Sequence, residues 1–129
     1  GGLEEKKCKT KKLKLHGYDD ENASEYSLQE FGTDREKILL LGIPEDNKSL
    51  SGKFYISKNL ILWSVKNEMA IHLEDLLARR VRCLFLDAKE TLKIAPQVAD
   101  IMAAALQEDE RWVKREIDDF KRITQNYIL

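Results

Sequence analysis

Apolar residues recur at intervals of three and four through the middle of the chain. These intervals match one face of an amphipathic helix that begins near Lys58. Ser57 is suited to cap the start of this helix. We therefore predict a helix with one stripe toward a core. The positions of this stripe are Ile61, Leu62, Val65, Met69 and His72.

A second stripe of the same spacing follows at Leu73, Leu77, Val81 and Leu84. Another face of this segment is charged, because Asp75, Arg79 and Arg82 are separated by four and three residues. Arg80 falls beside the apolar stripe.

Start and stop signals divide the rest of the chain into helices. A short helix is predicted over Glu21–Phe31, ended by Gly32. Thr33–Glu36 resembles a capping box that opens a second helix, which continues through Leu41 and stops at Gly42. The turn-forming residues Ile43–Gly52 predict an exposed loop.

Further helix signals lie in the last third of the chain. Asp87–Glu90 resembles a capping box, and Pro96 stands where a helix could restart, so two shorter helices are expected to meet there. A final helix from about Asp109 places apolar residues on one side. The sequence predicts an all-α fold, a compact bundle of about five to six helices with an irregular N-terminal segment. The apolar residues of the final helix are Val113, Ile117, Phe120 and Tyr127.

Composition narrows the function classes. The chain has 22 basic and 23 acidic residues among 129, so its net charge is close to zero. A general attraction to nucleic acid through net positive charge is therefore not expected. Only Cys8 and Cys83 are present, which argues against a disulfide scaffold, and a bridge between them is not expected. No apolar run approaches the length that spans a bilayer.

Charge is uneven at the start of the chain. Lysines crowd residues 6–14, and carboxylates follow at 19–25. We interpret residues 1–18 as the tail of a preceding domain or a linker, with Gly1 and Gly2 as a cloning scar. Residues 19–129 then form a helical domain. The alternative for the lysine-rich start is a basic arm that contacts phosphate.

Few residues suggest catalysis or cofactor binding. His16 and His72 have no metal-ligand spacing with each other or with cysteine, and the glycines form no G-x-G-x-x-G or P-loop run. Ser64, Glu68 and His72 stand at steps of four, but nothing suggests an oxyanion site beside them.

Charged residues inside apolar helical sequence need partners. We interpret Glu68, Asp75, Arg79 and Arg80 as structural ion pairs, because a catalytic carboxylate would also need a cleft. The aromatic and thioether residues read as core or interface positions. They are Trp63, Met69, Met102 and Trp112.

Several of these segments together resemble the C-terminal domain of FAD-dependent glycerol-3-phosphate dehydrogenases. The resemblance covers nearly the whole chain and is most specific over Glu68–Asp87. The matching segments are Lys14–Gly17, Asn67–Ala70 through Asp75, Arg79–Arg80, Phe85–Asp87 and Ala95–Ala103. The chain departs from the family in having Asn67 where His is frequent, and Gln107–Glu108 where Gly-Trp is common, which puts a helix break there in question.

The resemblance implies part of a bacterial enzyme that oxidises sn-glycerol 3-phosphate to dihydroxyacetone phosphate on FAD and passes electrons to quinone. It implies that upstream FAD and substrate domains hold the flavin and substrate, so that no catalytic or cofactor-binding residue is assigned to this chain. Glu68, Asp75, Arg79 and Arg80 would then serve domain architecture. The resemblance also implies a cytoplasmic enzyme at the inner face of the membrane. We predict that this domain covers or braces the upstream domains and contributes to contacts between two copies.

A hypothesis from another class remains open. The chain would then be a stand-alone helical interaction or regulatory module that docks a charged partner. A module of the helix-turn-helix type would need a basic recognition helix, whereas the predicted helices here carry both positive and negative charges.

Overall fold

The computed structural model describes residues 29–128, and these residues are helical without a strand. The chain divides into two units, residues 1–35 and 36–129. In the first, Gln29–Asp34 (η2) forms 3-10 turns interrupted at Gly32, whose φ is 50°. Residues 21–28 of the predicted first helix lie outside the described residues, as do the lysine-rich start and the irregular N-terminal segment.

The next predicted helix is present but shorter than expected. Helix α1 is Arg35–Leu39, and Leu40 and Leu41 add only single turn hydrogen bonds to Glu36 and Ile38. The predicted loop contains a 3-10 turn, η3 (Pro44–Asn47), with its proline in the first turn. A proline is tolerated there because the first N–H groups of a helix have no internal acceptor.

Helix α2 is Lys58–Asn67, and the Ser57 side chain accepts a hydrogen bond from the Leu60 N–H, as predicted. The prediction that Met69 and His72 continue this helix is wrong. Met69 has a φ of 56°, so the chain turns away there. Its side chain is 83% exposed, and Met69 is therefore not a core residue.

The second apolar stripe is carried by two short elements. These are a π-helical turn, η4 (Asp75–Arg80), and helix α3 (Cys83–Leu86), separated by Arg82 with a φ of 56°. Leu73, Leu77 and Leu84 are buried, as the spacing predicts.

Helix α4, Ala88–Leu106, runs without a break through Pro96. The prediction of two helices meeting there is wrong. A proline inside a helix costs about 3 kcal/mol, but Ala95, Val98 and Ala99 beside it are buried in the core, which offsets that cost. The Asp87 carboxylate caps the helix by accepting from the Glu90 N–H.

The break that the sequence left in question is present at the end of α4. Gln107 has a φ of 59°, and the Glu108 N–H donates to the Ala103 carbonyl at 2.9 Å. Gln107 thus takes the left-handed conformation that glycine usually supplies at a helix end.

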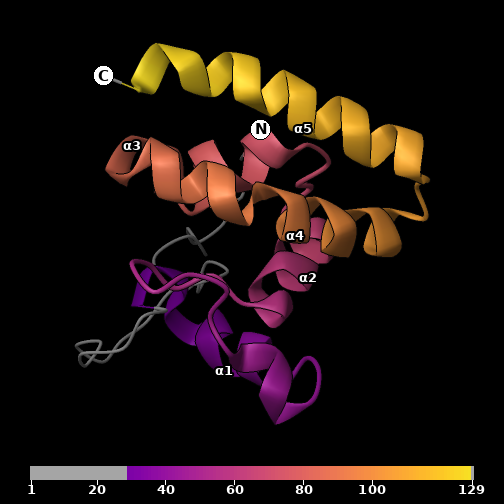
Figure 1. Ribbon diagram of the computed structural model, residues 1–129. Coiled ribbons are helices and arrows are strands. Elements are labelled where there is room, and N and C mark those ends of the chain that lie inside the picture. The colour runs from indigo at the N-terminus through magenta and orange to yellow at the C-terminus, as the bar shows by residue number, and fades with distance from the viewer. Residues whose placement is uncertain (1–28, 129) are drawn as a thin grey trace, which may run out of the picture. The chain divides into compact units, whose positions relative to one another are not determined.

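Helix α5, Glu110–Thr124, begins close to the predicted start at Asp109, which caps it, and ends in a 3-10 turn, η5 (Gln125–Tyr127). Figure 1 shows α5 returning along α4 in the opposite direction. A short connection of this kind makes consecutive helices antiparallel neighbours.

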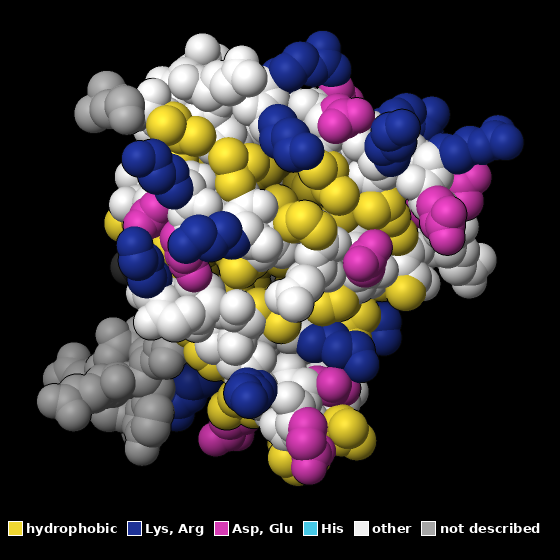
Figure 2. Space-filling view, viewed as in Figure 1, with side chains coloured by type: hydrophobic (Ala, Val, Ile, Leu, Met, Phe, Trp, Pro, Cys, Tyr) yellow, Lys and Arg dark blue, Asp and Glu magenta, His cyan; other side chains and the backbone are white. Residues whose placement is uncertain are grey.

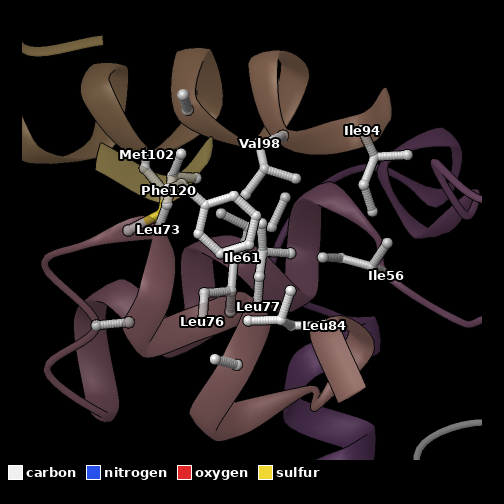
Figure 3. Packing of buried hydrophobic residues seen from close by; sticks show 14 of the residues in the cluster. Ile56, Ile61, Leu73, Leu76, Leu77, Leu84, Ile94, Val98, Met102 and Phe120 are labelled. Carbon is white, nitrogen blue, oxygen red and sulfur yellow. The ribbon is translucent and has the colours of Figure 1, made fainter. Parts of the chain in front are cut away.

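One hydrophobic core joins α2, η4, α3, α4 and α5. Figure 3 shows Val98 and Met102 of α4 on the side of Phe120 of α5 and the leucines of the segment before α4, whereas Ile94 of α4 points toward Ile56. The all-α prediction is confirmed.

Candidate functional site

The sequence singled out Glu68 and Arg80, and the structure places them beside each other. The Arg80 guanidinium donates to the Glu68 carbonyl oxygen at 3.1 Å, and its Nε lies 4.0 Å from Glu68 Oε2. That Oε2 atom is buried and accepts no hydrogen bond. Arg80 therefore ties the end of α2 to η4 chiefly through the backbone, across the bend at Met69.

Asp75 and Arg79 lie on the charged face of the same segment. Asp75 Oδ2 accepts from the backbone N–H groups of Ile71 and His72, at 3.2 and 3.0 Å. Arg79 lies 3.5 Å from Asp75 Oδ1 and 3.3 Å from Glu74, with 67% of its side chain exposed. An ion pair this exposed contributes little to stability, so the carboxylate acts mainly on the backbone.

Sequence reasoning missed a close contact between distant segments, that of Glu116 with His72 and Leu73. Glu116 on α5 is 8% exposed, and its Oε2 accepts from the buried Leu73 N–H at 2.9 Å. Its Oε1 lies 2.8 Å from His72 Nδ1, which raises the pKa of His72 through that hydrogen bond. A signal was present, because Glu116 stands four residues from both Trp112 and Phe120 on the buried face of α5.

The arrangement of Ser64, Glu68 and His72 at steps of four is not formed, because α2 ends at Asn67. Ser64 is fully buried, and His72 is instead bound to Glu116. Asn67 donates its side-chain amide to the Trp63 carbonyl, 3.3 Å away. The side chain that departs from the family pattern thus bonds within its own helix.

Asp87 combines a helix cap with an ion pair. Besides capping α4, its carboxylate binds the Lys53 ammonium group, and this hydrogen bond lowers the pKa of Asp87 and raises that of Lys53. Glu90, in the first turn of α4, accepts from the Ser51 hydroxyl at 3.1 Å. These contacts fix the loop before α2 to the start of α4.

The remaining singled-out side chains lie in the core. Trp63, Trp112 and Met102 are buried, as predicted. Cys83 is a buried free thiol whose pKa burial raises to about 12, and Cys8 lies outside the described residues. Such a thiol packs as a small apolar residue.

Within residues 29–128, no group of His, Cys, Asp and Glu side chains could hold a metal ion. No helix in this range is long and apolar enough to cross a bilayer. Figure 2 shows that one face carries apolar side chains between Lys and Arg side chains. The large apolar residues that remain exposed fall into three groups: Leu39, Leu40 and Ile43; Met69 and Ile71; and Phe85, Leu86 and Tyr127.

These features define a helical domain in which most of the singled-out charged residues hold helices and loops together. A sequence model of the C-terminal domain of alpha-glycerophosphate oxidase matches residues 8–113, and the chain belongs to this family. The chain is thus a domain of an oxidoreductase family. No curated protein and no solved structure matches the chain.

The residues that the structure describes do not fit the flavin dinucleotide that the family implies. Dinucleotides bind where a strand runs through a glycine-rich turn into a helix N-terminus. Helix α4 begins instead at Asp87, whose carboxylate already occupies the first-turn N–H and is paired with Lys53. A further carboxylate, Glu90, lies in that first turn, so a pyrophosphate would meet like charge there.

Proposed function

We propose that this domain is the C-terminal helical part of a flavoprotein that oxidises sn-glycerol 3-phosphate to dihydroxyacetone phosphate. The family match over residues 8–113 carries the proposal. FAD and substrate are held by domains that precede this one in the same polypeptide, and this domain serves architecture and interfaces.

The electron acceptor divides the proposal into two versions. The residues that resemble the dehydrogenases favour quinone and an enzyme at the inner face of the cytoplasmic membrane. The family description names an oxidase, which favours molecular oxygen. Both versions share the same reduction of flavin by glycerol 3-phosphate.

The test uses the complete polypeptide to which this domain belongs. Its visible spectrum should show a bound flavin, and anaerobic sn-glycerol 3-phosphate should bleach that spectrum while sn-glycerol 1-phosphate does not. The reduced protein is then mixed with a short-chain quinone or with oxygen, and hydrogen peroxide is measured. Which of the two compounds reoxidises the flavin separates the two acceptors. A complete polypeptide without flavin would overturn the proposal and favour the stand-alone interaction module.

A second measurement addresses the role of the domain itself. FAD and glycerol 3-phosphate are titrated separately against the isolated 129-residue chain by calorimetry. We expect no saturable binding, since the start of α4 is already capped and acidic. Micromolar binding of either compound would contradict a purely architectural role.

A further inference from the structure

Three of the exposed apolar residues lie together in one cluster. Phe85, Leu86 and Tyr127 are 58%, 72% and 46% exposed, and we call them the α3 ridge. The rings of Phe85 and Tyr127 pack edge to face, with centroids 5.2 Å apart. The two rings hold each other in place, so the ridge is formed before any partner binds.

Two hollows adjoin the ridge, and Phe85 and Leu86 line both. The first has a volume of about 660 Å³, and the second, which also reaches Tyr127, about 350 Å³. Hollows beside an aromatic ridge can receive the side chains of a protein surface.

The charges around the ridge are mainly positive. Arg79 and Arg82 line the first hollow, and Lys89 lines the second with Asp87. Asp87 is neutralised by Lys53, and Arg79 by acidic neighbours, whereas Arg82 and Lys89 have no ion pair within the described part of the chain. Arg82 also holds the strained left-handed backbone conformation, which is concentrated at functional positions in proteins.

We propose that the α3 ridge docks onto an acidic and apolar surface of the domain that precedes this one in the same polypeptide. This inference rests on the proposed function, because a C-terminal domain has such a neighbour. Covalent linkage gives that neighbour a high effective concentration, so a modest complementary surface covers the ridge in cis. Apolar residues rimmed by uncompensated cations select carboxylates at the edge of the contact.

The complete polypeptide, with Phe85 replaced by the photoreactive p-benzoylphenylalanine, tests this arrangement. After irradiation in detergent-free buffer and again with anionic vesicles, mass spectrometry locates the cross-link. We expect an intramolecular cross-link to a preceding segment that contains carboxylates and apolar residues. Cross-links to a second copy or to lipid, or no cross-link, would overturn the proposal.

Charge reversal supplies the matched control. Arg82→Glu should lower the yield of the intramolecular cross-link about fivefold or more, because like charges then face each other. Arg115→Glu, an exposed arginine on α5 away from the ridge, should leave the yield unchanged. Equal yields in both variants would contradict the charge argument.

Flavin bleaching by glycerol 3-phosphate, measured on the same preparations, reports separately on the proposed function. A cis cross-link in a polypeptide that lacks flavin would refute that function and leave the docking surface standing. Bleaching without the cross-link would refute the docking surface alone.

Discussion

Glu116 Oε1 lies 2.8 Å from His72 Nδ1, so a buried carboxylate on α5 holds a histidine 44 positions earlier in the chain. An ionised carboxylate only accepts hydrogen bonds, so the histidine Nδ1 carries the proton. The other carboxylate oxygen accepts from the Leu73 backbone N–H. The pair joins α5 to the segment that precedes η4.

Replacement of Glu116 by leucine should destabilise the fold. The Leu73 N–H is buried and would lose its acceptor, which costs about 1–3 kcal/mol. The free energy of unfolding is measured by urea titration followed by circular dichroism. Asp118→Leu, an exposed carboxylate on the same helix, is the control and should change stability by less than about 0.5 kcal/mol. Equal losses in the two variants would show that the hydrogen bonds of Glu116 contribute nothing.

The same contact makes part of the stability depend on pH. Because Glu116 raises the folded-state pKa of His72 above 6.5, the stabilisation is fully present below pH 6.5 and is lost as pH rises through the raised pKa. The stability difference between the wild type and His72→Gln should therefore be larger at pH 6 than at pH 9. NMR titration of the imidazole proton checks the direction, and a His72 pKa at or below 6.5 would contradict the prediction.

Replacing Arg80 by alanine should cost more than replacing Arg79. Arg80 donates to the Glu68 carbonyl and is the cation nearest the buried Glu68 Oε2, so its loss should lower the free energy of unfolding by about 1–3 kcal/mol. Arg79→Ala removes only exposed ion pairs, worth about 0.2–1 kcal/mol. Thermal unfolding of both variants at one pH compares them, and a larger loss for Arg79→Ala would refute the assignment.

Two glycines give a matched test of packing in the first loop. A Cβ atom on Gly42 would lie 2.6 Å from Asn59 Oδ1 and 2.8 Å from Asp46 Oδ2. Asn59 is fully buried and donates to Asn47 Oδ1 at 2.8 Å, so its side chain has little room to move. Gly42→Ala should cost about 1–3 kcal/mol by overpacking.

Gly52 is the control, because nothing lies within 4 Å of a Cβ atom placed there. Gly52→Ala should be neutral or slightly stabilising, since alanine restricts the unfolded chain. Chemical denaturation of the two variants side by side decides the point. A neutral Gly42→Ala would mean that Asn59 can shift after all.

The helices were predicted well where local chemistry decides them. Ser57 and Asp87 each cap a helix as expected, and Asp109 caps the helix whose start was predicted there, because a cap needs only its own side chain and an N–H nearby. Pro96 and Met69 were predicted wrongly because tertiary packing decides both. The core keeps α4 continuous through a proline, and the chain turns at Met69 although the apolar spacing continues.

The contacts of the charged residues were predicted less completely than the helices. Spacing along a helix indicated the Asp75–Arg79 contact, because four residues separate them. The link between Glu116 and His72 spans 44 positions, and no local period reports a contact between segments that far apart. A carboxylate between Trp112 and Phe120 was the only sequence sign of it.

The two methionines should respond oppositely to truncation. Met102 is fully buried in the core, so Met102→Ala should cost about 2–5 kcal/mol through lost burial and a cavity. Met69 is 83% exposed in the turn after α2, so Met69→Ala removes almost no buried surface. It should cost less than about 0.5 kcal/mol in the isolated chain by urea denaturation. A loss above 2 kcal/mol for Met69→Ala would mean that its side chain packs into the core and that α2 continues past Asn67.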